Sequence, residues 1–319
     1  MRRLKDGGMP RWASHSIAVV AVSLVLLSTH SVARCQENPG IPLSGQSPSG
    51  QDAPIPQLTV RAKAELGRRV GTFVNQVSGS GGHNDEPAAL WRGPICLLVA
   101  GLPHDDGQRV FDRLFHTLSS VGVAMGSAGC RPNFFFIVSA QPDALLNEAW
   151  HKNYSLFGNQ PGVRAFIDSA RPVRVWYNAG LIGNDGSTSS VVIASLSGFE
   201  GVPTYKIAPS GLSEFGLNRQ IETVIAVIDI RQVMGLDWRQ IADFVAMSGL
   251  TEIRPDTDFG DAPTILRLFS ASGEHRLMSL SPWDKALLQE LYRTDQGSKN
   301  QRQDVARGML RDLYADRGN

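Results

Sequence analysis

The sequence predicts a single α+β or α/β domain, in which helices flank a mixed sheet and the C-terminal part is mainly helical. Three short apolar runs, residues 95–100, 133–139 and 223–230, have the length of buried strands. Segments with apolar residues at helical spacing lie between and after these runs. Strands and helices alternate along one continuous chain, which is typical of one such domain.

The first 33 residues predict an export signal. Basic residues precede an apolar run at residues 17–27, and the small residues Ser31 and Ala33 follow it. As a helix this run covers only about 16 Å, while the hydrocarbon core of a bilayer is roughly 30 Å thick. A secretory signal peptide cleaved after Ala33 is therefore favoured over a membrane anchor. The mature protein is expected in the periplasm or outside the cell, without a stable membrane span.

Residues 34–56 are expected to form a disordered tether ahead of a globular domain at residues 57–319. The tether is rich in Pro, Gly, Ser and Gln and cannot bury enough apolar surface to offset its ordering entropy. Removal of the leader takes four basic residues and one acidic residue from totals of 31 and 30. The remaining 27 and 29 give a net charge of −2. The mature chain thus lacks the excess of basic residues with which proteins usually bind nucleic acids, so a nucleic-acid partner is excluded.

The first half of the domain predicts a short helix starting near Leu58, then a parallel strand–helix–strand unit. The apolar runs 95–100 and 133–139 are its strands, and residues 106–121 have the helical spacing between them. A further helix is expected over residues 142–154, with a proline in its first turn.

The second half predicts strands followed by helices. Residues 172–177 alternate like a half-exposed strand, and further strands are expected at 191–196 and 223–230. Asp237 and Ser281 have the residue types of N-caps, so helices are expected to begin after each of them. A last amphipathic helix is expected over about residues 300–314.

Cys96 and Cys130 are predicted to form a disulfide. Each cysteine stands at or just before the start of one strand of the parallel unit, and parallel strands begin at the same edge of a sheet. An oxidising compartment favours the bond, which would stabilise the fold by roughly 3–4 kcal/mol. The alternatives are two buried free thiols or a catalytic cysteine, but an apolar strand does not stabilise a catalytic thiolate.

The sequence has no ligand spacing typical of a metal or cofactor site, so none is predicted. No two of the mature histidines stand four residues apart, and zinc needs three or four converging ligands. The densest group, at residues 104–106, is a His-Asp-Asp turn whose acidic residues suit the start of a helix. Residues 256–261 lack the spacing of an EF-hand and are interpreted as an acidic surface loop, with a weak irregular calcium site as the alternative. Phosphate-binding glycine loops and a G-x-S-x-G elbow are missing as well.

Residues 171–178, RPVRVWYN, combine aromatic and basic side chains. Such a stretch could border a groove. The favoured interpretation is an exposed strand whose Trp176 packs on Arg174 or on the core.

Several segments together resemble an uncharacterised family of exported bacterial proteins, over nearly all of residues 58–315. They are WRGPICLLVAGL, GCRPNFFFIVS, RPVRVWYN, DWRQIADFVAMSGL, TILRLF and SPWDKALLQELY. The helix in the fourth segment and the last segment are more distantly similar to exported zincin-like metallopeptidases. In those proteins the helix carries H-E-x-x-H-x-x-G-L, so the resemblance allows a zincin-like fold.

On that pattern the zinc-binding helix is degenerate. Ala242 and Ala246 stand at the two histidine positions, and Asp243 stands at the glutamate position. Methyl groups cannot bind a metal, and without a metal an acidic neighbour has no hydroxide to generate. The alternative is an ordinary amphipathic core helix, and both interpretations predict no zinc hydrolysis here.

The sequence therefore predicts an exported, non-catalytic envelope protein with a binding or assembly role. Its partner is an envelope protein or ligand that the sequence does not identify, and no catalytic or cofactor-binding residue is assigned. The alternative is an exported hydrolase whose site is built from scattered residues. Its candidates are Asp243, His275 and the turn at residues 104–106.

Overall fold

The computed structural model describes residues 55–78, 88–158, 162–183, 217–254, 256–270, 276–295, 298 and 300–316. The described part of residues 54–319 forms one compact unit. The predicted leader ending at Ala33, most of the predicted tether and the strand expected at 191–196 lie outside the described residues. The first helix begins at Ile55 rather than Leu58 and is longer than expected.

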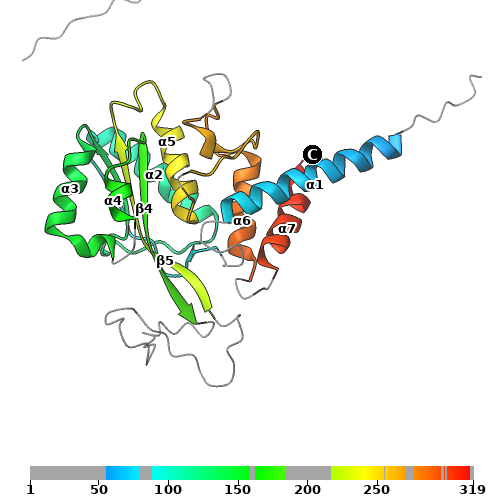
Figure 1. Ribbon diagram of the computed structural model, residues 1–319, viewed down its shortest axis with the longest axis horizontal. Helices are drawn as coiled ribbons and strands as arrows, with labels where there is room; N and C mark the ends of the chain where they lie inside the picture. The colour runs from blue at the N-terminus through cyan, green and yellow to red at the C-terminus, as the bar shows by residue number, and fades with distance from the viewer. Residues whose placement is uncertain are drawn as a thin grey trace, which may run out of the picture. The chain divides into compact units, whose positions relative to one another are not determined.

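A five-stranded, mostly parallel sheet forms the centre of the domain (Figure 1). Strand β5 (Leu217–Asp229) is central and runs parallel to β3 (Phe134–Ser139) and, near its own start, to β1 (Leu90–Trp91). Strand β2 (Leu97–Ala100) lies parallel on the outer side of β3. Strand β4 (Val173–Gly183) is antiparallel to β5 on its other side. The mostly parallel pairing makes the fold α/β.

Helices cover both faces of the sheet. Helix α2 (His104–Ser120) packs against β2 and against α5 (Trp238–Leu250) on one face. On the other face α3 (Pro142–Lys152) and α4 (Val163–Ile167) pack against β3, β4 and β5. The predicted strand–helix–strand unit is confirmed as β2, α2 and β3, with its two strands parallel.

The C-terminal part is helical, as expected. Helices α6 (Pro282–Arg293) and α7 (Gln301–Asp316) pack against each other, and α1 (Ile55–Ser78) lies along α7 (Figure 1). The described residues also include two single turns of 3-10 helix, η1 (Tyr154–Phe157) and η2 (Ile265–Arg267). In the described part of the chain, no helix is both long enough and apolar enough to cross a membrane.

The two predicted N-caps are confirmed. The Asp237 carboxylate accepts the backbone N–H of Arg239 at 2.7 Å, and the Gln240 side chain accepts the N–H of Asp237 at 3.1 Å. The Ser281 hydroxyl accepts the N–H of Asp284 at 3.0 Å. Each cap satisfies N–H groups that the first turn of a helix leaves without partners.

The alternation of β5 divides the core into two parts. Val224, Ala226 and Ile228 join the main cluster, whereas Ile225 and Val227 join a smaller cluster under α3 and α4. A strand buried on both faces reads as a continuous apolar run, which is why this stretch is so conspicuous in the sequence.

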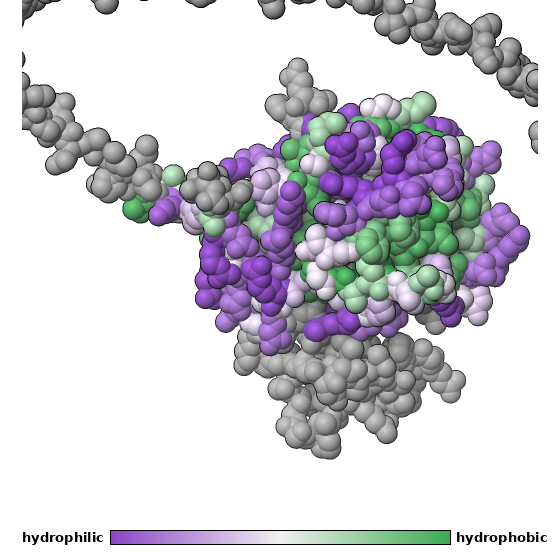
Figure 2. All heavy atoms as spheres, turned by 180° about the vertical axis from the view of Figure 1, so that it is seen from behind, coloured by the Kyte–Doolittle hydropathy of each residue, from purple (hydrophilic) through white to green (hydrophobic). Residues whose placement is uncertain are grey.

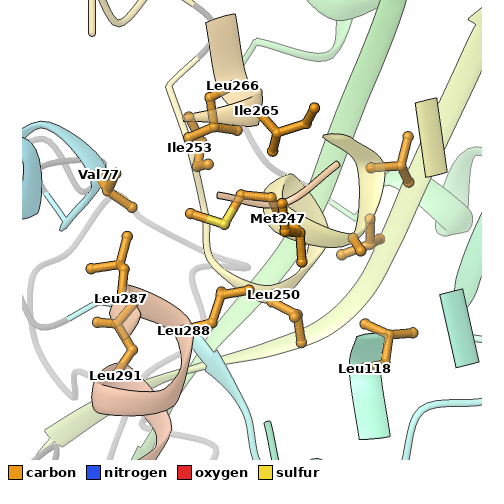
Figure 3. Close-up of a cluster of buried hydrophobic side chains, with 14 of the residues drawn as sticks. Val77, Leu118, Met247, Leu250, Ile253, Ile265, Leu266, Leu287, Leu288 and Leu291 are labelled. Atoms are coloured by element: carbon orange, nitrogen blue, oxygen red, sulfur yellow. The ribbon is translucent and has the colours of Figure 1, made fainter. Parts of the chain in front are cut away.

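The main cluster also joins the sheet layer to the helical part. Figure 3 shows Met247 and Leu250 of α5 together with Leu287 and Leu288 of α6, all of them fully buried. Full burial of one such side chain contributes about 1.5–3 kcal/mol.

Strand β4 departs from the expectation of a half-exposed strand over residues 172–177. It extends to Gly183, and no residue of 172–177 is exposed, since Val173, Arg174, Trp176 and Tyr177 are buried and the other two are half-buried. Even Arg174 is buried, and its guanidinium donates to the Ile167 carbonyl at 2.7 Å and pairs with Asp143. Such a pairing is needed because an unpaired buried charge is costly.

Candidate functional site

Helix α5 carries the positions that the resemblance assigns to zinc ligands. Ala242 and Ala246 are both fully buried in the main hydrophobic cluster. An imidazole at either position would overfill this packed interior. The small side chains are thus accounted for by core packing, as the interpretation of an ordinary core helix expects.

Asp243 is fully buried and its carboxylate is occupied. Arg113 of α2 donates from Nε to Oδ1 at 2.7 Å and from Nη2 to Oδ2 at 2.6 Å. The backbone N–H of Leu280 also donates to Oδ2, at 3.0 Å. The hydrogen bond to Asp243 raises the pKa of Arg113. This carboxylate therefore links three segments of the chain: α2, α5 and Leu280, which lies two residues before the start of α6.

Sequence reasoning missed Arg113. The available signal was Asp243 itself, because a carboxylate on the apolar side of a core helix needs a cation or several donors. Choosing Arg113 from the other arginines required knowing that α2 and α5 pack together.

Gly249 explains the Ser-Gly-Leu end of the helix. A Cβ atom at this position would collide with the ring of Phe134 on β3. The Gly249 carbonyl also accepts a hydrogen bond from Nε1 of Trp91 at 2.7 Å. Close packing of α5 on the sheet thus requires glycine at this position.

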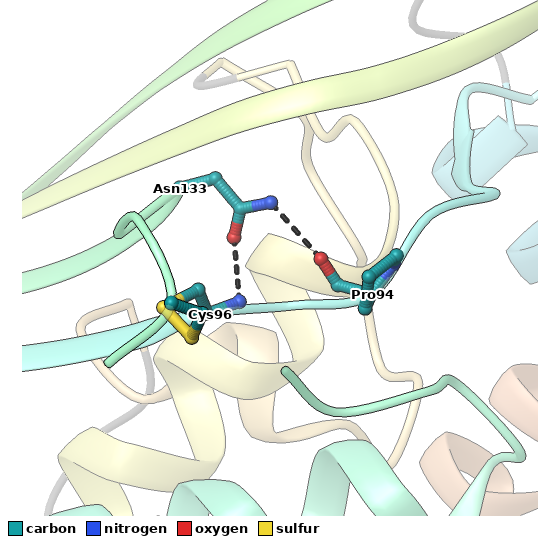
Figure 4. Close-up of a disulfide and its surroundings, with 4 residues drawn as sticks. Pro94, Cys96 and Asn133 are labelled. Atoms are coloured by element: carbon teal, nitrogen blue, oxygen red, sulfur yellow. Dashed lines mark hydrogen bonds between the residues drawn. A yellow bond between two sulfur atoms is a disulfide. The ribbon is translucent and has the colours of Figure 1, made fainter. Parts of the chain in front are cut away.

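The predicted disulfide between Cys96 and Cys130 is present, with a Cα–Cα distance of 5.9 Å (Figure 4). The Asn133 side chain accepts the N–H of Cys96 at 2.7 Å and donates to the Pro94 carbonyl at 3.1 Å. Gly126 lies so close that a Cβ there would come within 2.6 Å of the Cys130 sulfur. Because the two sulfurs are bonded to each other, neither provides a thiolate nucleophile.

The candidate histidines do not converge. His104 and Asp105 are exposed at the start of α2, with a ring nitrogen 3.3 Å from the carboxylate. The ring of His151 bonds to a backbone carbonyl of its own helix. His83 and His275 lie outside the described residues. Among the residues that the structure describes, no group of three or more His, Cys, Asp or Glu is placed to hold a metal.

The acidic loop at residues 256–261 has separate partners for its carboxylates. Asp256 pairs with Arg171, and Asp261 pairs with Arg69 at 3.0 Å. Asp258 accepts the N–H of Gly260 at 2.8 Å. These contacts suit the favoured interpretation of an acidic surface loop.

A groove of about 730 Å³ lies along β4, a volume in the range of ligand sites. Its floor consists of five consecutive residues, 173–177. One wall comes from α4 and the residues after it, and the other comes from α5 and residues 252–270. More of the groove surface is apolar than polar, and its apolar wall residues are Ala165, Phe166, Phe244, Ile253, Phe259, Leu266 and Phe269. Polar and charged residues also line the walls, namely Ser169, Arg171, Ser248, Glu252, Arg254, Asp256, Thr257, Asp258 and Ser270.

The floor of the groove is an open edge of the sheet. The Pro172 carbonyl accepts the N–H of Asp229 at 2.9 Å, so these two residues form a hydrogen-bonded pair across β4 and β5. Pairs of that kind alternate along an antiparallel ladder. The backbone N–H and C=O groups of Val173, Val175 and Tyr177 therefore point away from β5. In the described part of the chain, β5 is the one strand that pairs with β4.

The hydrogen bonds between β5 and β3 support the same orientation of the β4 backbone groups. The N–H of Val224 donates to the Asn133 carbonyl at 2.9 Å, and the N–H of Ile230 donates to the Ser139 carbonyl at 3.1 Å. Even-numbered residues of β5 thus face β3. Its odd-numbered residues, including Asp229, face β4.

The polar groups of the groove mainly hold its shape. The Tyr177 hydroxyl donates to the Ser248 carbonyl at 3.0 Å and accepts the N–H of Ile253 at 3.4 Å. Burial raises the pKa of Tyr177 far above its ordinary value. Nε of Arg174 and Oγ1 of Thr257 are buried without a hydrogen-bond partner among the described residues. Because buried polar groups are usually paired, the floor and one wall of the groove have unused hydrogen-bonding capacity.

Both interpretations of RPVRVWYN capture part of this site. Trp176 packs in the smaller core cluster with Phe157 and Phe166, and its Nε1 donates to the Phe157 carbonyl at 3.1 Å. The same strand also forms the floor of the groove. Sequence reasoning missed the residues of both walls, which come from distant segments.

Comparison of the chain with protein-family models, with curated proteins and with solved structures finds no match. The resemblance to exported zincin-like peptidases stays a hypothesis.

Proposed function

We propose that this protein is an exported, non-catalytic binding protein of the cell envelope and that the groove along β4 is its ligand site. The observation that carries the proposal is the open edge of β4 at the floor of an apolar groove. Concave, mostly apolar sites with a few placed polar groups are the usual form of binding sites.

The ionisable groups of the groove support binding more than catalysis. General acid–base catalysis needs a group whose pKa lies near the working pH. Tyr177 is moved away from that range by burial. Asp256 is paired with Arg171, and Glu252 is paired with Arg219 at 2.6 Å. These contacts stabilise the walls beside the apolar side chains that a ligand would contact.

The disulfide supports export. Disulfides persist in oxidising compartments and are rare in the cytoplasm, and Cys96 is bonded to Cys130. Together with the leader expected to end at Ala33, the bond favours the periplasm or the cell exterior. A tether ahead of the domain would let the groove reach partners in the envelope.

The location of the ligand site can be tested by photo-crosslinking. The full chain, produced in its native cells, carries p-benzoylphenylalanine in place of Ser169, which lines the groove. The matched control carries the same group in place of Gln108, an exposed residue of α2. We expect an adduct from the first protein and none from the second.

Adducts of equal yield at both positions, or adducts at Gln108 alone, would contradict a ligand site in the groove. Mass spectrometry of the same samples also measures the mature N-terminus. Cleavage after Ala33 predicts that the exported protein begins at Arg34.

A further inference from the structure

We infer that the ligand of the groove is an extended polypeptide segment, apolar on both of its faces, which adds to the sheet as a strand beside β4. This inference rests on the proposed function and names the class of ligand for the same site.

The floor of the groove offers a repeating backbone pattern. Val173, Val175 and Tyr177 each direct one N–H and one C=O away from β5. Alternate residues of a strand are about 6.8 Å apart. Another extended backbone presents acceptors and donors at the same spacing, whereas a lipid chain has none. Strand addition to an exposed edge is an established mode of peptide recognition.

The shape of the groove favours a single segment over a second copy of the whole domain. The floor is recessed, since Val173 is 5% exposed and Tyr177 is 8% exposed. A second copy would bring the walls beside its own β4 into collision with these walls. Five floor residues span roughly 17 Å, which suits a segment of about five residues.

The walls determine the side chains of the ligand. Val173 and Tyr177 belong to the main core cluster, on the side of Phe244, and Trp176 belongs to the smaller cluster, on the side of Phe166. Side chains of an added strand would point alternately to these two walls. Because each wall presents an aromatic ring, Phe166 on one side and Phe244 on the other, we expect apolar residues at successive positions, as in a strand buried on both faces.

The test uses fluorescent heptapeptides as probes. Each has Val, Ile or Leu at its five central positions and a lysine at each end. Two N-methylated versions of every binding peptide are compared, with methyl groups on one or the other alternating set of backbone amides. We expect one set to weaken binding at least tenfold and the other to change the dissociation constant by less than about threefold. Only a ligand that pairs through one edge of its backbone gives this asymmetry.

A variant pair tests the same edge in the protein. Val175→Pro removes an N–H that faces the groove and not β5, and proline is tolerated at such positions of edge strands. Val175→Thr keeps that N–H at similar volume and is the control. We expect Val175→Pro to weaken peptide binding at least tenfold and Val175→Thr to keep it within about threefold. Circular dichroism checks that both are folded, and if Val175→Pro is not, the N-methyl comparison on the wild-type protein decides.

Three results would overturn the inference. In the first, no peptide of the panel binds. In the second, the two methylated sets bind equally. In the third, the protein forms a dimer that Val175→Pro dissociates, which would make a second copy the occupant.

If the Ser169 crosslinks hold a lipid or another non-peptide molecule, the proposed binding function stands and the peptide inference fails. If the panel binds as expected but crosslinks appear at Gln108 alone, the groove accepts peptides and the proposed cellular role fails.

Discussion

At the scale of single residues, the buried charges of this protein are held by several short contacts each. Asp229 at the end of β5 is 2% exposed and accepts from the side chains of Arg231 and Gln232. Hydrogen bonding to Arg231 is the main reason that the pKa of Asp229 lies well below its ordinary value. Asp243 is likewise held by several contacts, from the Arg113 guanidinium and from the N–H of Leu280. A carboxylate in the core is therefore an indicator of a partner that the sequence does not reveal.

Arg113→Ala is expected to lower the free energy of unfolding by about 3–5 kcal/mol, because it leaves the buried Asp243 carboxylate without its cation. Arg109→Ala, on the same helix, removes an exposed pair with Asp106 and should cost less than about 1 kcal/mol. Urea unfolding of both variants measures the difference. Equal losses would mean that the Asp243 pair contributes no more than a surface pair.

Gly249→Ala is expected to destabilise the protein by about 1–3 kcal/mol, because the added methyl group collides with Phe134. Gly71→Ala in α1 should stabilise it by about 0.5–1 kcal/mol, since no atom lies within 4 Å of the added Cβ and alanine favours the helix. Thermal unfolding of the two variants should show melting temperatures that move in opposite directions. A rise for both would indicate that α5 can shift away from the sheet without loss.

At the scale of elements, one covalent bond closes the β2–α2–β3 unit. Cys96 and Cys130 are 34 residues apart in the sequence and join the starts of two neighbouring parallel strands. Asn133 ties the same corner by two further hydrogen bonds. Cys96, Cys130 and Asn133 lie at the opposite end of these strands from the start of α2. Their contacts stabilise the sheet there and are not part of the β4 groove.

Replacing both Cys96 and Cys130 by alanine is expected to lower the free energy of unfolding by about 3–4 kcal/mol, since the unfolded chain regains the entropy of the open loop. The reduced wild-type protein is the control and should lose a similar amount. Thiol titration of the denatured, unreduced chain should find one free thiol among its three cysteines. Three free thiols would contradict the bond.

At the scale of the whole molecule, a buried acid fixes α6 to the segment that leads to it from α5. Asp284 of α6 accepts hydrogen bonds from the Thr264 hydroxyl at 2.5 Å and from the N–H groups of Ile265 and Ser281, both at 2.9 Å. Burial outweighs these bonds and raises the pKa of Asp284 above its ordinary value of 3.8. The folded protein thus binds this proton more tightly than the unfolded chain does.

The contribution of Asp284 to stability is therefore expected to be largest at low pH. It should decrease as the pH rises from about 3.8 to the higher pKa of the folded state, and then stay constant. Asp284→Asn cannot titrate and removes this dependence. Urea unfolding between pH 3 and pH 7 should show that the stability of the wild type, relative to this variant, falls with rising pH. A relative stability that rises with pH would mean that the hydrogen bonds outweigh burial.

Features that depend on nearby residues were predictable from the sequence alone. Apolar periodicity indicated β2, α2, β3 and β5, and residue type indicated the caps at Asp237 and Ser281. The disulfide was predictable as well, because a parallel crossover brings the starts of two strands to one edge.

Features that depend on which distant faces meet were decided only by the tertiary structure. Arg113 and Asp243 are 130 residues apart, and the requirement for Gly249 arises from a ring on β3. The groove along β4 exists because α4 and residues 252–270 stand on either side of an edge that no other described strand covers. Local propensity determines the elements, but the packing of their faces determines which backbone groups and charges remain open to a ligand.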